Sequence, residues 1–369
     1  MVYRVHHKQS AFRKVSQSRS SDPYAYRRYT DRTFYETRTE IDSQRSLLDN
    51  FLTDNEVSTP CRSIQVVRDF CETEDQASCD RLEPKICLDD CKLGTKKSRR
   101  AFHSLTTDEL HRHLRLERFD LRDYPNADYR KISIRNLNAK LILVLAQTAA
   151  HHQRDALRDA FSKHISCSTS LRIHEPVDGF VTPRLELHLP FLTLREVSSE
   201  SHEWKARGPK DEGKRWLDLP LPASKSRGNY RPDRFLISES HTSIVLSVWD
   251  RSNWAGYAFF KGMSVTDEEE SDEEAGGEDD GEGLGDVADE LAEENDPKPK
   301  RDIFAPDGDS HDMYADDPIH DPRRYFLRIT GVWMSFVVRE YRYLVEELEA
   351  WVKAWVRSCG RALTYLLDH

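Results

Sequence analysis

The stretch RLELHLPFLTLREV (residues 184–197) decides the fold class of this chain. Large apolar residues occupy alternate positions over much of its length, which is the period of a β-strand with one buried face. An extended segment, CSTSLRI (167–173), comes before it, and the two are separated by PVDG (176–179), whose proline and glycine favour a turn. We therefore predict a pair of neighbouring strands here.

Further strands follow after a polar segment. The apolar runs are RFLIS (234–238), SIVLSVW (243–249) and WAGYAFF (254–260). The four residues DRSN (250–253) join the last two runs, and a connection of this length is typical of a hairpin. The centre of the chain is thus expected to form a mostly antiparallel sheet of about five strands.

Helices are expected before this sheet. Thr106 and Glu109 have the spacing of a capping box, in which the hydroxyl and the carboxylate each satisfy a free backbone N–H. A second helix is predicted over AKLILVLAQTAAHHQRDALRDAFSKHI (139–165), where apolar residues recur every three or four positions. Helices on both sides of a strand-rich centre indicate an α+β fold.

One long helix is predicted at 321–369, with Asp321 as its N-cap and Pro322 in its first turn. A coiled-coil-like stripe with steps of four and three residues runs along it: Val337, Tyr341, Leu344, Leu348, Trp351, Trp355, then Ala362 and Leu366. Two interpretations stay open: the stripe packs on the protein's own body, or it binds a helical partner or a second copy. The candidate partner-binding residues are Leu348, Trp351, Trp355 and Leu366.

Composition divides the chain into four parts: a largely disordered tail (1–100), an α+β body (101–264), an acidic disordered insertion (265–320) and the long helix (321–369). The formal charge is −10, and the 17 acids between Asp267 and Asp296 account for it, since removing 17 negative charges leaves +7. Such a run repels itself and cannot bury apolar area, so we interpret it as a connector. Thr266 and Ser271 precede acids directly and are candidate phospho-acceptors.

No catalytic motif of a familiar type occurs, and we assign no catalytic residue, cofactor or metal ligand. The cysteines between Cys61 and Cys91 contain only one pair at zinc-ligand spacing, Cys87 and Cys91. The longest apolar runs, LILVLA (141–146) and WMSFVV (333–338), are far shorter than the roughly 18 residues that span a bilayer. We expect a soluble protein of the cytoplasm, with the nucleus as an alternative, and no nucleic-acid partner.

Several segments together resemble, in the same order, a large family of uncharacterised proteins from filamentous fungi. The resemblance covers about residues 120–345, and it rests on YPNADYRKISIRNLNAKLILVLAQTAAHHQRDALRDAF, SLRIHEPVDGF, LELHLPFLTLRE, NWAGYAFF and DPIHDPRRYFLRI. Some relatives are labelled CorA-like, after a magnesium transporter in which a long helix leads into the membrane. The Gly-Met-Asn signature of that transporter does not occur here, since the one Gly-Met is in KGMSV.

The sequence therefore predicts a non-enzymatic interaction or scaffold protein that presents its C-terminal helix to an unknown partner or to a second copy. The alternative is a soluble CorA-like relative that binds a divalent metal or regulates a membrane transporter. An enzyme of unfamiliar type would need His151 or His152 to meet carboxylates in a pocket.

Overall fold

The structure is a computed structural model of the 369-residue chain. It describes residues 47–53, 64–76, 84–93, 98–119, 126–174, 183–197, 234–249, 253–262, 301–306, 313–314 and 319–367.

A seven-stranded mixed sheet forms the centre of the protein, in the order β2-β1-β3-β7-β6-β5-β4. The central neighbours β3 and β7 are parallel, whereas the other neighbouring pairs are antiparallel. The strands are β1 (Lys85–Cys91), β2 (Ser98–Phe102), β3 (Tyr129–Arg135), β4 (Ser170–His174), β5 (Arg184–Val197), β6 (Arg234–Val248) and β7 (Trp254–Lys261).

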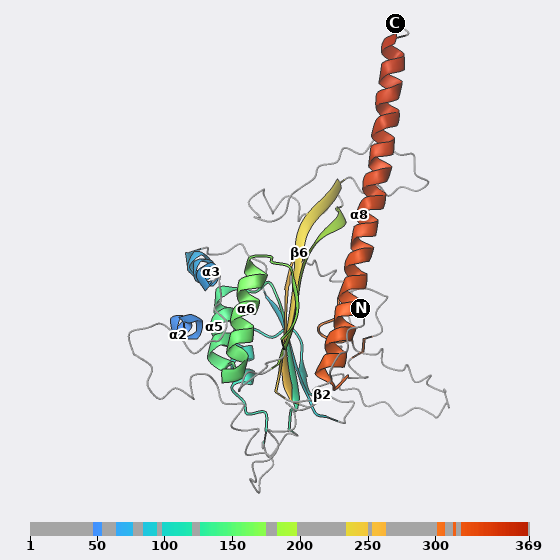
Figure 1. Cartoon of the computed structure of the whole chain (residues 1–369). Coiled ribbons are helices and arrows are strands. Elements are labelled where there is room, and N and C mark those ends of the chain that lie inside the picture. Colours follow the sequence, from blue (N-terminus) through green and yellow to red (C-terminus); the bar gives the residue numbers. More distant parts are fainter. Residues whose placement is uncertain are drawn as a thin grey trace, which may run out of the picture.

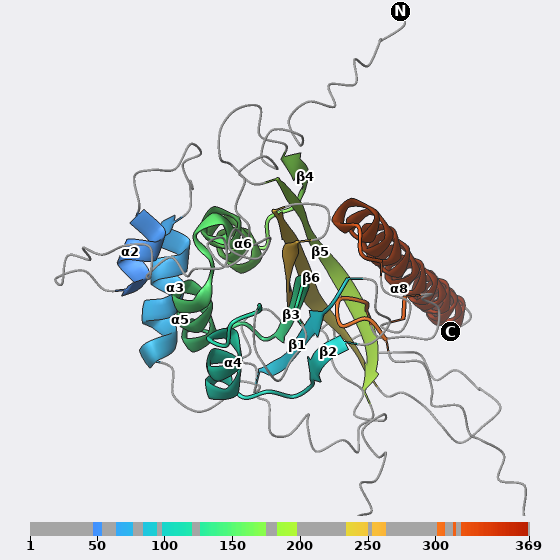
Figure 2. The same cartoon turned by 90° about the horizontal axis from the view of Figure 1, so that it is seen from below.

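Helices cover both faces of this sheet (Figures 1 and 2). Among the described residues, one face carries five α-helices and a short 3₁₀ turn, and the other face carries one long helix. The elements of the first group are α2 (Leu47–Thr53), α3 (Ile64–Gln76), α4 (Thr107–Leu114), α5 (Ala139–Thr148), η2 (His151–Gln153) and α6 (Arg154–Ile165). The long helix is α8 (Pro322–Leu367), with 46 residues.

Each face has its own apolar core, because residues of one strand alternate between the two sides. On β3, Ile132 and Ile134 point toward α5 and α6, and Tyr129 points toward α8. On β6, Val245 joins the first core and Ile244 joins the second. The sheet is therefore buried on both sides, which leaves polar strand residues without contact to water.

The structure confirms an α+β fold with a long C-terminal helix, but it corrects the predicted sheet of about five mostly antiparallel strands. RFLIS and SIVLSVW belong to one continuous strand, β6, which pairs with β5 over its whole length. The sheet gains β3, and it gains β1 and most of β2 from the segment assigned to the tail. Because β3 pairs with β7 in parallel, the sheet is mixed.

The predicted boundaries of the parts also need correction. Two helices and two strands lie within 47–102, so the folded body begins before residue 101. Part of the predicted insertion 265–320 is folded as well, since 301–306 contributes the fully buried Phe304 to the core beneath α8. Residues 1–46 and 263–300, with the candidate phospho-acceptors Thr266 and Ser271, lie outside the described residues.

The single helix predicted over 139–165 is two helices with a break between them. Ala149 has an extended backbone with ψ of 136°, and the side chain of Gln153 accepts a hydrogen bond from the Ala150 N–H. The break lets α5 and α6 lie side by side on the sheet (Figure 2). The capping box of Thr106 and Glu109 is confirmed at the start of α4.

Candidate functional site

The long helix α8 begins as predicted and is fixed to the sheet over its first half. Asp321 caps it, since its carboxylate accepts hydrogen bonds from the backbone N–H groups of Arg323 and Arg324 at 3.0 and 2.9 Å. The helix then packs on β5, β6 and β7 through large buried side chains: Tyr325, Phe326, Ile329, Val332, Trp333, Phe336, Val337 and Leu344. The second half continues past the sheet toward the C-terminus (Figure 1).

A second apolar stripe runs along α8 on a side that the body leaves largely uncovered, although Leu348 in it also packs against the cluster of Leu194 and Leu344. We call it the outer seam, and it consists of Leu327, Met334, Val338, Tyr341, Val345, Leu348, Val352 and Trp355. All of these except the half-buried Leu348 are between 41 % and 64 % exposed, and Val356 beside the seam is 55 % exposed. From Met334 onward the steps alternate between four and three residues, which is the spacing of a coiled coil.

The outer seam shares three residues with the stripe predicted from sequence: Tyr341, Leu348 and Trp355. Three other predicted residues, Val337, Leu344 and Trp351, each lie one position before a seam residue. The sheet covers Val337 and Leu344 and leaves Val338 and Val345 exposed. Trp351 is half-buried on the flank of the outer seam. The helix includes Leu366, whose side chain lies outside the described residues.

A buried charged cluster fixes the start of α8 to the strands β1 and β3 of the sheet. The ammonium group of Lys131 lies 2.9 Å from a carboxylate oxygen of Asp89 and 2.8 Å from one of Asp302. The Tyr325 hydroxyl at the start of α8 donates to Asp302 at 2.7 Å, and the thiol of Cys91 donates to Asp89 at 3.2 Å. The cluster therefore joins β1, β3, the segment 301–306 and α8.

The pKa values in this cluster follow from burial and charge. Burial alone would lower the pKa of Lys131, but the carboxylates of Asp302 and Asp89 outweigh it and hold that pKa well above its usual value. Burial and the neighbouring Asp302 raise the pKa of Tyr325. Burial likewise raises the pKa of the Cys91 thiol, so this cysteine stays protonated and is a poor nucleophile.

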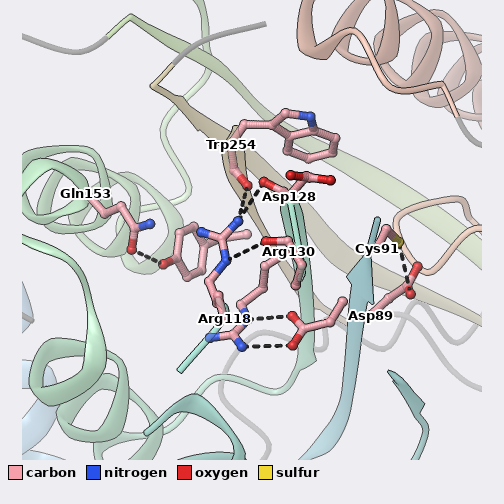
Figure 3. A network of polar contacts seen from close by, with 10 residues as sticks. Asp89, Cys91, Arg118, Asp128, Arg130, Gln153 and Trp254 are labelled. Carbon is pink, nitrogen blue, oxygen red and sulfur yellow. Dashed lines mark hydrogen bonds and ion pairs between the residues drawn. The ribbon is translucent and has the colours of Figure 1, made fainter. Parts of the chain in front are cut away.

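Two arginines fix the centre of the sheet on the other face (Figure 3). Arg118 donates to the carbonyl oxygens of Asp128 at 2.7 Å and Trp254 at 3.4 Å, and so bridges the starts of the parallel strands β3 and β7. Arg130 holds Asp90 of β1 with two hydrogen bonds of 2.6 and 2.8 Å. Both arginines are buried, and every bond described here stays within the protein, so they hold the strands together and offer no exposed anion site.

A third polar cluster lies between α6 and the strands β5 and β6. The Ser243 hydroxyl lies 3.0 Å from Nδ1 of His164 and 2.9 Å from Nδ1 of His188. Nε2 of His188 is 3.7 Å from the Glu186 carboxylate, which also accepts a 2.7 Å hydrogen bond from Lys163. The residue types match a serine–histidine–carboxylate set, but Ser243, His188 and Glu186 are at most 1 % exposed, so substrate has no access to them.

Burial also sets the protonation states of this cluster. It lowers the pKa of His164 well below its usual value, lowers that of His188, and lowers that of the neighbouring His241 to about 4. Burial would raise the pKa of Glu186, but hydrogen bonds with His188 and Lys163 lower it to about 2. Near neutral pH the cluster thus holds neutral imidazoles and an ionised carboxylate paired with Lys163.

Sequence reasoning missed the charged cluster and the histidine cluster. Glu186 and His188 alternate with leucines on β5, a pattern that ordinarily indicates a face in water, but α6 covers that face. The histidines predicted for an unfamiliar enzyme do not take part: His151 is exposed, and His152 contacts the edge of Trp249 at 5.1 Å between ring centres.

The described residues offer neither a cluster of metal ligands nor a membrane-spanning helix. Among the described residues, no group of three or more histidines, cysteines and acids could hold a metal ion, and Cys71, Cys87 and Cys91 of the predicted cysteine cluster form no disulfide bond. In the part of the chain that the structure covers, we find no helix with the length and hydropathy that a membrane crossing requires.

Comparison with known proteins found no match to a protein-family model, to a curated protein or to a solved structure. Nothing in these comparisons indicates a catalytic activity. Within the described residues, the outer seam of α8 is a row of exposed apolar side chains at coiled-coil spacing.

Proposed function

We propose that this chain is a non-enzymatic interaction protein and that the outer seam of α8 is its binding surface. The observation that carries this proposal is the exposure of a row of large apolar side chains at coiled-coil spacing, on a helix that continues beyond its own body. The cytoplasm is the proposed compartment, with the nucleus as an alternative.

The exposed area supports a protein partner. An aromatic side chain buries roughly 150–250 Å² when fully covered and an aliphatic one somewhat less, so seven side chains at about half exposure and the half-buried Leu348 present on the order of 700 Å² together. The largest apolar patch of an ordinary monomer is about 300–600 Å². Covering the seam with another apolar helix would remove this area from water, which an anionic ligand could not do.

The fixed base of α8 supports the same function. The indole N–H of Trp333 donates to the Phe304 carbonyl at 2.9 Å, and that of Trp254 donates to the His320 carbonyl at 3.1 Å. Together with the Lys131 cluster, these bonds hold the helix in one orientation on the sheet. A surface held this way loses little conformational freedom on binding, which favours affinity.

Site-specific photocrosslinking in cells tests this function. A photoreactive phenylalanine analogue at position 352 of the outer seam should yield covalent adducts with protein, and the same analogue at position 350 should not. Ala350 is a matched control, because it is exposed on the opposite side of the same helix turn.

The outcome depends on specificity. Adducts at position 352 that disappear when Val345→Glu is added support the function. A variant that forms no adduct at position 352, or forms the same adducts at 350, would refute it. The exposure of Val345 makes the glutamate harmless to the fold, which circular dichroism should verify.

A further inference from the structure

We propose that the partner of the outer seam is a second copy of this chain, whose α8 lies parallel and in register with the first. This inference rests on the proposed function and gives its partner. It follows from the residue types in the seam, from the area exposed and from the side of α8 that the body occupies.

The heptad positions of the seam can be assigned from its spacing. The steps of four and three residues place Val338, Val345 and Val352 at successive a positions. The intervening d positions hold Met334, Tyr341, Leu348 and Trp355, and Leu327 lies one heptad before Met334. Within a parallel coiled coil, valine at a together with leucine at d, as at Leu348, favours two strands over three or four.

The seam is self-complementary in a parallel pair, because each of its side chains then packs against the same residue of the other copy. In a parallel pair each a residue faces its own equivalent, so valine meets valine and the larger d residues meet one another. An antiparallel pair would place Val345 against a d residue such as Leu348 and would remove this match. The two-fold axis of the parallel pair lies along the seam, and a symmetric dimer needs only this one surface.

The area is sufficient for a stable dimer. A standard interface buries about 800 Å² on each partner, and the outer seam with Val356 presents on the order of 700 Å². Its seven seam positions from Met334 to Trp355 cover three heptads, or about 32 Å of helix at 1.5 Å per residue.

The body leaves room for the second helix. Val337 and Leu344, which pack on the sheet, occupy the g positions on one flank of the seam, and the exposed Arg342 and Glu349 occupy the e positions on the other flank. A two-fold axis along the seam places the two g flanks on opposite sides. The two bodies therefore lie on opposite sides of the paired helices and do not compete for the seam.

A native cysteine provides the test of register. Cys359 is the a position that follows Val352, and it is a free, half-buried thiol. Only a parallel, in-register pair brings the two Cys359 residues face to face, and a disulfide requires Cα atoms about 4.4–6.8 Å apart. In oxidation by oxygen with copper phenanthroline, the two thiols lose two protons and two electrons to the oxidant and form one S–S bond.

The full chain should give a crosslinked dimer in this reaction at micromolar protein. Cys359→Ser should abolish the crosslink, and so should Val345→Glu combined with Val352→Glu, whereas Ala350→Glu should retain it. A second variant, Cys359→Ser with Val345→Cys, moves the thiol two heptads closer to the body, again to an a position, and should restore the crosslink. If the paired helices separate only near their C-terminal ends, this variant should still form the crosslink.

The outcomes separate this inference from the proposed function. A dimer that neither thiol position crosslinks would overturn the parallel register. Adducts at position 352 with a different protein and none with this chain would overturn the second copy, while the proposed function would stand. A monomer without any adduct at position 352 would overturn both.

Discussion

Replacing Lys131 by methionine should destabilise the fold strongly, because it leaves two buried carboxylates without their cation. The oxygens of Asp89 and Asp302 lie 2.9 and 2.8 Å from one nitrogen, so they are no more than about 5.7 Å apart. At an effective dielectric constant of about 20, two unit charges at that separation repel by on the order of 3 kcal/mol. Removing one partner of a buried ion pair costs about 3–5 kcal/mol, which agrees with this value.

Chemical and thermal unfolding followed by circular dichroism measures this loss. We expect a fall of about 3–5 kcal/mol in the free energy of unfolding, and roughly 10 °C in Tm for a body of this size.

The matched control is Lys353→Met. Lys353 forms an equally short ion pair with Glu349, at 2.6 Å, but both side chains are 60 % exposed. Water screens such a pair, so its loss should change the free energy of unfolding far less than the loss of Lys131 does. Equal effects of the two substitutions would refute the reasoning that the Lys131 cluster holds the start of α8 to the sheet.

Further predictions concern packing, pH and magnesium. Gly256→Ala should lower the free energy of unfolding by about 1–3 kcal/mol, because the added Cβ would lie 2.8 Å from the Leu246 side chain. Gly331→Ala, at an exposed position of α8 where the added Cβ meets nothing within 4 Å, should instead raise the free energy of unfolding by up to about 1 kcal/mol. The free energy of unfolding should fall by on the order of 3 kcal/mol as the pH drops from about 6.5 to about 4, because His241 binds a proton in the unfolded chain but stays neutral in the folded protein. Below that range, protonation of Glu186 should lower the free energy of unfolding further between about pH 4.5 and pH 2. A flat urea-unfolding profile between pH 7 and pH 4 would contradict this. Millimolar Mg²⁺ should leave Tm unchanged, since the alternative CorA-like function requires a rise on binding to the native state.

The elements that the sequence predicted well are those whose signals are local. The capping box of Thr106 and Glu109 and the cap of Asp321 depend on residues three positions apart, and both are present. The alternation of 184–197 is likewise a property of one strand, and β5 has these same bounds.

The elements that the sequence missed depend on partners far along the chain. The strand β1 contains Asp89 and Asp90, which look like residues of a solvated tail until Lys131 and Arg130 neutralise them on the neighbouring strand. The break after α5 contains neither proline nor glycine, so no local sequence signal predicts it. It allows two helices to pack on one sheet.

The candidate site shows the same division. The sequence predicted a coiled-coil stripe on the last helix, including Leu348 and Trp355, which lie in the outer seam. It could not decide which of two stripes one residue apart faces the sheet, since Val337 and Val338 have the same chemistry. Only the packing of α8 on β5 and β6 assigns Val337 to the core and Val338 to the surface.

The central claim is that the outer seam joins two copies of this chain, and native mass spectrometry of the full-length protein tests it most directly. The account predicts twice the 43.0 kDa mass of one chain for the native protein and for Ala350→Glu, and the mass of one chain for Val345→Glu with Val352→Glu. A native protein that stays at 43.0 kDa at micromolar concentration, or a dimer that the seam substitutions leave intact, would contradict it.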